Sequence, residues 1–310
     1  MNIHVLGAGA IGGWVAARLA AAGHAVTAQH SRGRLERVDI SEGGAQQTVQ
    51  FTRFDGFAEL LIVAVKAPAL PSVATELPLL IGPETLVMPM LNGVPWWFLP
   101  DKSLHSVDPD GRIAAAIPMA QVIGCVVHAS CFREAGRIIV KHADKLIIGE
   151  PDGAASERLA RVHALFDSAG LRPDRSGNIR RAIWYKLWGN ATINPLSALT
   201  RATADQILAN PECRQWMLEG MAELAAIGAR IGCPVSESGE DRMQVTARLG
   251  AFKTSMLQDV EAGRPIELEA LLGAPREIAR KIGLATPALD RIYGLTKLMA
   301  ESLGLMPGER

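Results

Sequence analysis

The segment Asn2-Ile3-His4-Val5-Leu6-Gly7-Ala8-Gly9-Ala10-Ile11-Gly12 decides the fold of this chain. Its apolar first half predicts a short buried strand, and residues 14–22 are a run of good helix formers that ends before a glycine. The glycines between them match the pattern G-x-G-x-x-G. In that pattern Gly7 permits a tight turn, Gly9 lets a pyrophosphate approach the backbone, and Gly12 lets helix and strand pack closely. The segment therefore predicts a dinucleotide-binding loop made of Gly7, Ala8, Gly9, Ala10, Ile11 and Gly12.

Strand and helix patterns alternate as far as about residue 176. Apolar runs predict buried strands at Leu60–Val65 and Leu86–Met90, and three further runs within residues 122–149 predict antiparallel hairpins that end the sheet. An amphipathic helix is expected at Glu157–Ala169. Beyond residue 176 long helical patterns follow one another, at Ile179–Leu199, Pro211–Ile231, Asp241–Val260, Ile266–Ile282 and Pro287–Leu303.

These patterns predict an α/β protein with an N-terminal Rossmann-type doubly wound sheet and a C-terminal all-helical domain. We expect residues 1–176 to bind the nucleotide and residues 177–310 to bind the substrate and carry the catalytic groups. Long apolar helices in the second half also suit a homodimer, which is a hypothesis at this point.

Composition narrows the functional class. The chain has 310 residues, with 32 basic and 32 acidic side chains and a formal net charge of zero, which argues against a general nucleic-acid binder. No His or Cys spacing fits a metal site. The uncharged stretch Ile113–Phe132 contains proline and glycine and ends in β-branched residues, so we interpret it as a short helix and a strand rather than a membrane span. Without a signal-peptide pattern, a cytoplasmic location is expected.

The residues after the second strand indicate which dinucleotide binds. An NAD site usually has an acidic residue about 20 residues past the glycine loop. Here residues 29–34 read Gln-His-Ser-Arg-Gly-Arg, and a hydroxyl with guanidiniums suits a 2′-phosphate. The sequence therefore predicts NADPH/NADP+ as cofactor, with Arg32 as the main contact and Ser31 or Arg34 assisting. Lys66 follows the strand 60–65 directly and should point toward the same crevice.

A polar stripe crosses the first long helix of the second half. Lys186, Asn190 and Asn194 are four residues apart, so they share one face of an otherwise apolar helix. A buried ammonium needs a partner, because leaving it unpaired costs several kcal/mol. Either a ligand or a carboxylate such as Glu267 could supply it. A lysine that merely reaches the edge of the helix is the structural alternative.

The motifs together resemble the ketopantoate reductase (2-dehydropantoate 2-reductase) family over nearly the full chain. The resemblance is carried by GAGAIG at residues 7–12, VAVKA at 63–67, LNGVP at 91–95, KLWGNATINPLSAL at 186–199, TSMLQDV at 254–260 and PIELEALLG at 265–273. The family reduces a 2-keto acid to a 2-hydroxy acid with NADPH, a step in pantothenate biosynthesis.

The resemblance implies a role for each matching residue. Lys186 corresponds to the general acid, and Glu267 to the acidic residue that works beside it. Substrate-binding positions correspond to Asn92, Asn190, Asn194 and Ser255, and cofactor contacts to Lys66 and Asn92.

The chain also departs from the family pattern. Leu272 stands where the family has an asparagine, and no asparagine occurs between residues 195 and 209, where a further substrate-binding one is expected near Ala204. The run Trp96-Trp97-Phe98 resembles a paralogue subgroup. Ketopantoate is the expected substrate, and a different 2-keto acid is the first alternative. A non-catalytic NADP(H) redox sensor is the second, and an opine or glycerol-phosphate dehydrogenase relative is the third.

Overall fold

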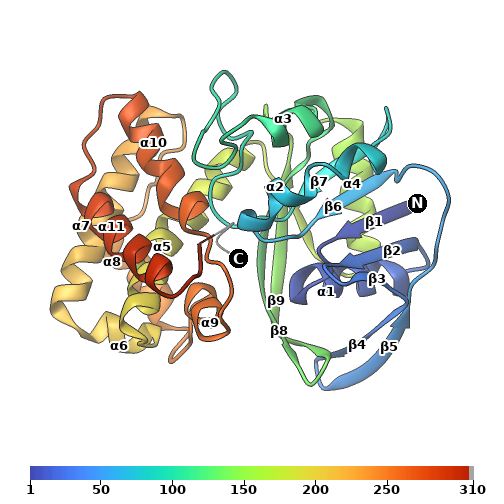
Figure 1. Cartoon of the computed structure of the whole chain (residues 1–310), viewed down its shortest axis with the longest axis horizontal. Coiled ribbons are helices and arrows are strands. Elements are labelled where there is room, and N and C mark those ends of the chain that lie inside the picture. Colours follow the sequence, from blue (N-terminus) through green and yellow to red (C-terminus); the bar gives the residue numbers. More distant parts are fainter. Residues whose placement is uncertain (307–310) are drawn as a thin grey trace. The chain divides into compact units, whose positions relative to one another are not determined.

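The computed structural model describes residues 1–306 of the chain (Figure 1). These residues form two compact units, one made of residues 1–91 with 112–182 and the other of residues 92–111 with 183–306. The mixed α/β architecture with a helical second half confirms the predicted fold class. The division into domains at residue 176 stays a prediction, and in the structure residues 92–111 group with the second unit.

The first unit contains two sheets. The first has the order β3-β2-β1-β6-β7, parallel except for β3, and the second has the order β10-β9-β4-β5 with β8 paired to β9. The strands of the first sheet are β1 (Asn2–Leu6), β2 (Ala25–His30), β3 (Gly33–Leu35), β6 (Leu60–Val63) and β7 (Leu86–Pro89). Those of the second are β4 (Arg37–Glu42), β5 (Ala45–Gln50), β8 (Gly124–Glu134), β9 (Arg137–Gly149) and β10 (Pro173–Arg175).

The helix α1 (Ala10–Ala21) contacts both sheets of this unit (Figure 1). Its small residues make this possible. A Cβ on Gly12 would overlap the Gly7 carbonyl oxygen next to β1, whereas a Cβ on Gly13 would meet Ile138 of β9. Trp14 and Leu19 are almost wholly buried, and Arg18, the one charged residue of the helix, pairs with Glu42 of β4 at 2.7 Å. The short helices of this unit are α2 (Leu70–Val73), α3 (Arg112–Ala116) and α4 (Glu157–Ser168).

The prediction for residues 122–149 is wrong in strand number and sheet. The two apolar runs after residue 136 are one long strand, β9, which pairs antiparallel with β8 and parallel with β4 and β10. The mostly polar residues 141–145 do not end the strand, although the β8–β9 pairing shifts register twice there, between His128 and Ala129 and between Ser130 and Cys131. The hairpin of β4 and β5, which turns at Gly43 and Gly44, was not predicted.

The second unit is helical. Its helices are α5 (Ile179–Thr200, of which residues 179–182 group with the first unit), α6 (Ala204–Ala209), α7 (Pro211–Arg230), α8 (Gly239–Ala247), α9 (Ser255–Glu261), a π-helical turn (Glu269–Gly273), α10 (Ala274–Lys281) and α11 (Pro287–Ser302). The predicted helix over Asp241–Val260 is wrong, because the chain leaves it at Gly250 (φ +68°) and starts again behind the N-cap Thr254, whose side chain accepts from the Leu257 N–H. Pro195 lies inside α5, which continues past it.

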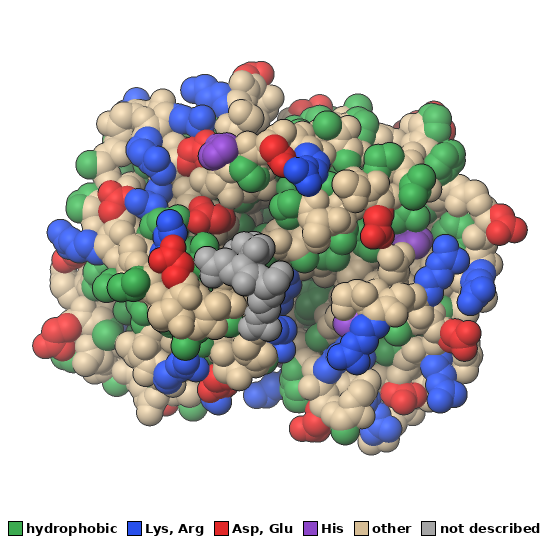
Figure 2. Space-filling view, in the orientation of Figure 1, with side chains coloured by type: hydrophobic (Ala, Val, Ile, Leu, Met, Phe, Trp, Pro, Cys, Tyr) green, Lys and Arg blue, Asp and Glu red, His purple; other side chains and the backbone are tan. Residues whose placement is uncertain are grey.

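Residues 92–111 are held to the helices of the second unit by specific contacts. The Glu277 carboxylate accepts hydrogen bonds from the backbone N–H groups of His105 and Ser106 and from the Ser106 hydroxyl, at 2.7–3.0 Å. Phe98 stacks on Trp184 with 5.7 Å between ring centroids. Acidic and basic side chains are mixed over the face shown in Figure 2. No helix within residues 1–306 is long and apolar enough to cross a membrane.

One buried histidine makes the stability of the first unit pH-dependent. Burial, assisted by the charge of Arg34, lowers the pKa of His4 from 6.5 to about 4. Between these two pH values the unfolded chain binds a proton that the folded chain does not, so stability falls as the pH drops from about 6.5 to about 4. The full effect is about 3 kcal/mol.

We expect His4→Phe to flatten this pH dependence. The measurement is the free energy of urea unfolding at about pH 7 and about pH 4.5. His105→Asn, which changes an exposed histidine, is the control and should keep the wild-type slope. An unchanged slope in His4→Phe would contradict the assignment.

Candidate active site

The predicted glycine loop joins β1 to α1 and has the shape of an anion cradle. Gly7 adopts φ +93°, where a Cβ would overlap the backbone of Ala64 and Val65. Around Gly9 the space is open, since the nearest atom to a Cβ there would be the Gly7 carbonyl oxygen at 3.9 Å. Gly9 is also the N-cap of α1, whose first N–H groups have no partner within the helix. The loop therefore fits a diphosphate group, by open space and by free donors together.

The residues predicted to select the cofactor lie in a tight turn. Ser31 and Arg32 connect β2 to β3 and are exposed, and the Ser31 Oγ lies 3.1 Å from the His30 Nδ1. Burial and then the charges of Arg133 and Arg32 lower the pKa of His30. The turn at the end of β2 is thus surrounded by positive charge, as a 2′-phosphate requires.

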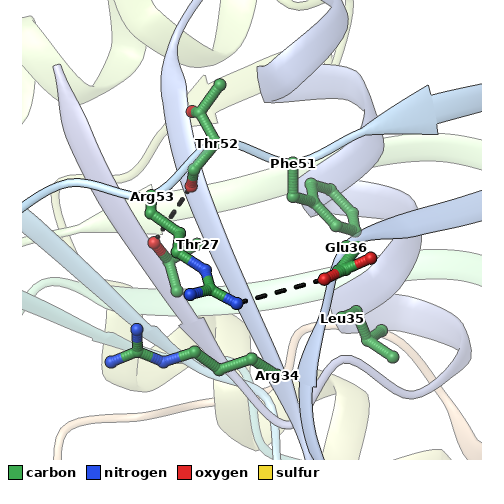
Figure 3. Close-up of a pocket in the computed structure, with 7 residues that line it drawn as sticks. All are labelled: Thr27, Arg34, Leu35, Glu36, Phe51, Thr52 and Arg53. Atoms are coloured by element: carbon green, nitrogen blue, oxygen red, sulfur yellow. Dashed lines mark hydrogen bonds and ion pairs between the residues drawn. The ribbon is translucent and has the colours of Figure 1, made fainter.

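Arg34 takes a different position from its predicted partner Arg32. It belongs to β3 and lines a small cavity beside the middle of β2 (Figure 3). In the same cavity Arg53 lies 4.0 Å from Glu36, and the Thr27 hydroxyl donates to the Thr52 carbonyl oxygen. Arg34 pairs with Gln29, one residue before the carboxyl end of β2, and its part in the nucleotide site stays a prediction.

Arg133 reaches the glycine loop from β8 and was not predicted. Its Nη2 donates to the Ala8 carbonyl oxygen at 2.9 Å, and its Nη1 donates to the Gly136 carbonyl oxygen at 3.1 Å. Burial lowers the pKa of its guanidinium. No local pattern could have identified it, because the contact spans 125 residues and depends on how the β8–β9 hairpin folds back. Lys66 follows β6, which pairs with β1, so it lies at the same end of the sheet as the loop.

Lys186 and Glu267 are joined by the side chain of Asn92. The Lys186 Nζ donates to the Asn92 Oδ1 at 2.9 Å, and the Asn92 Nδ2 donates to the Glu267 Oε2 at 3.1 Å. An ammonium only donates and a carboxylate only accepts, so the two ends of the amide match the two charged groups. Glu267 is buried, with 7% of its surface exposed, and Lys186 is half-buried rather than enclosed. All three residues belong to the second unit.

Two tryptophans fix the helix that carries Lys186. The Trp184 and Trp188 indole N–H groups donate to the Leu224 and Met221 carbonyl oxygens of α7, at 3.0 and 2.8 Å. Asn190 and Asn194 continue the Lys186 face along α5, as predicted, and Asn194 is 5% exposed. Ser255, expected late in a helix, is instead the exposed first residue of α9.

Comparisons with known proteins give a consistent result. Residues 3–153 match the family described as Ketopantoate reductase PanE/ApbA, and residues 178–300 match its C-terminal counterpart. The 2-dehydropantoate 2-reductase of Mesorhizobium japonicum is 35% identical over 98% of this chain and 99% of its own.

Solved structures agree with this match. A Ralstonia solanacearum MolK2 protein described as a ketopantoate reductase superposes with a TM-score of 0.91 at 47% identity, over 98% of this chain and 99% of that one. D-mandelate dehydrogenase, solved with NADH and anilino(oxo)acetate, shares the fold at 20% identity, with a TM-score of 0.83 over 98% of this chain and 100% of that one.

The glycine loop yields a stability prediction with an internal control. Gly12→Ala places a Cβ against the Gly7 carbonyl oxygen and 2.9 Å from the Ala64 Cβ, so it should cost about 1–3 kcal/mol of folding free energy. Gly9→Ala enters open space and should cost about 0.5 kcal/mol or less. Urea unfolding of both variants tests this, and equal losses would contradict the packing described.

Proposed function

The chain belongs to the ketopantoate reductase family, and on that premise we propose that it reduces a 2-keto acid, 2-dehydropantoate first of all, to the 2-hydroxy acid with NADPH. The chain is an oxidoreductase, as its family is. The observation that carries the finer proposal is the hydrogen-bonded series Lys186–Asn92–Glu267.

The chemistry of that series suits carbonyl reduction. NADPH, when bound, supplies the hydride that the keto carbon accepts. The Lys186 ammonium stabilises the negative charge that develops on the keto oxygen and then transfers a proton to it. The Asn92 amide holds this ammonium in place through its oxygen, and through its nitrogen it is itself held by Glu267. Asn190 and Asn194 lie along the same face of α5, where their amides can bind the polar groups of the substrate.

The first unit supplies the residues proposed for the cofactor. Gly7, Ala8, Gly9, Ala10, Ile11 and Gly12 would hold the diphosphate, Ser31 and Arg32 the 2′-phosphate, and Lys66 a further anionic group. We add Arg133 for the diphosphate, because its guanidinium bonds to the glycine loop beside the positive end of α1, where both positive charges favour an anion. A contact of Asn92 with the nicotinamide stays a prediction, as does a homodimer.

A different 2-keto acid is the second candidate substrate. Leu272 and Ala204 occupy the positions where the family pattern has asparagines, and both are fully buried. The chain thus offers fewer amides than that pattern does. The catalytic series is unaffected, so the reaction would be the same on another 2-keto acid.

The proposal is tested by the consumption of NADPH with 2-dehydropantoate and with a panel of other 2-keto acids. Lys186→Ala should lower kcat by about 100- to 10,000-fold, the usual contribution of a general acid. Lys297→Ala, which changes a lysine on α11, should leave kcat unchanged. If wild-type protein binds NADPH but reduces none of the acids, the reductase proposal is wrong.

Cofactor choice has its own test, in binding constants rather than rates. Arg32→Ala should weaken NADPH binding about 10- to 100-fold and leave NADH binding unchanged, since only NADPH has the 2′-phosphate. Arg133→Ala should weaken both, because both carry the diphosphate. Arg53→Ala is the control arginine outside the site. Equal losses of the two nucleotides in Arg32→Ala would contradict the assignment of that residue.

A further inference from the structure

The helix that follows Glu267 begins with an irregular turn. Residues 269–273 form a π-helix, in which the Ala274 N–H donates to the Glu269 carbonyl oxygen, five residues back. The regular α10 begins only after it. Such π-turns are rare and are found frequently at functional sites.

The π-turn leaves one carbonyl group available for a contact outside the helix. In a π-helix each carbonyl oxygen accepts from the N–H five residues later, so the donor for the Ala270 carbonyl would be residue 275. That residue is Pro275, which has no N–H. The four-residue alternative would need the Ala274 N–H, which bonds to Glu269. The Ala270 carbonyl oxygen accepts instead from the Val94 N–H, at 2.8 Å.

This contact places the segment that carries Asn92. Gly93 lies between Asn92 and Val94 and adopts φ +79°, and a Cβ on it would overlap the Ala270 carbonyl group. The backbone of the segment therefore lies directly on the π-turn. Glu267 precedes the same turn, and its carbonyl oxygen accepts from the Leu271 N–H at 3.1 Å. One turn of backbone thus determines where both Glu267 and the Asn92 amide lie.

We propose that Pro275 is a positioning residue, which keeps the Ala270 carbonyl available to the Val94 N–H and so holds the Asn92 amide between Lys186 and Glu267. The catalytic part of this inference rests on the proposed reductase function. An N–H at position 275 would compete for the Ala270 or Leu271 carbonyl oxygen, and the turn would then approach regular α-helical geometry. The Val94 N–H of the 92–94 segment would thereby lose its acceptor.

The variant that tests this is Pro275→Ala. Alanine is the better helix former, so the protein should fold with an unchanged or raised Tm. Hydrogen exchange of the Val94 amide should become at least tenfold faster, and kcat should fall about tenfold. Pro287→Ala is the matched control, because Pro287 opens α11, where an N–H has no helical partner in any case. It should change neither quantity.

A second background separates positioning from general stability. If Pro275 acts through Asn92, then Pro275→Ala should have no further effect on kcat in an Asn92→Ala protein, whereas unrelated effects would multiply. Gly93→Ala, which displaces the same segment from the other side, should reproduce the loss of kcat and the faster exchange at Val94.

Each outcome decides between the two proposals. Unchanged exchange at Val94 in Pro275→Ala would overturn the positioning role, whether or not the protein is active. Full additivity with Asn92→Ala would overturn it as well. A wild-type protein inactive toward every 2-keto acid would overturn the reductase function instead, and that result is read from wild-type protein alone.

Discussion

The hydrogen bonds of the Asn92 side chain are the interaction on which the rest of the site depends. The Asn92 amide bonds to both charged groups proposed for the reaction, because its oxygen accepts from the Lys186 ammonium and its nitrogen donates to the Glu267 carboxylate. This arrangement requires three segments, from three distant parts of the sequence, to converge within hydrogen-bond distance. The backbone contacts of Gly93 and Val94 with Ala270 are the means by which two of the three are joined.

A comparable constraint governs the first unit. Because α1 packs against both sheets, most of its surface is buried, and the two adjacent glycines Gly12 and Gly13 serve the two sheets separately. The open space at Gly9 is different, since nothing in the protein fills it. The loop thus contains glycines of two kinds, with Gly7 and Gly12 required by packing and Gly9 beside open space, where a diphosphate is proposed to bind. This distinction is not visible in the pattern G-x-G-x-x-G itself.

The sequence predicted what local patterns can encode. The strand–loop–helix at the start, the helix of Lys186 and the order of most later helices follow from periodicity and glycine placement, and the structure has them. The predictions from sequence were wrong where contacts between residues far apart in the chain determine the structure. The long strand β9 continues through a polar stretch because β8 pairs with it on both sides of that stretch. The helix predicted over residues 241–260 is interrupted by a turn at Gly250, which periodicity alone does not predict. Arg133 and the π-turn were missed for the same reason, since their roles come from partners more than 100 residues away.

The residues proposed for the reaction are a different set from the positions that would contact the rest of the substrate. The groups proposed for proton transfer are held in place by backbone contacts and by the Trp184 and Trp188 indole hydrogen bonds. The place that they define for the reacting carbonyl group therefore does not depend on the rest of the substrate. Where the family pattern has two asparagines, this chain has Leu272 and, near the second position, Ala204, whose buried side chains carry no hydrogen-bond donor. A site without such a donor does not favour substrates that carry a hydroxyl group. The hydroxyl loses its hydrogen bonds to water on binding and gains none from the protein in return. Substrates with fewer hydroxyl groups therefore lose less on entering this site than they would in a relative with both asparagines.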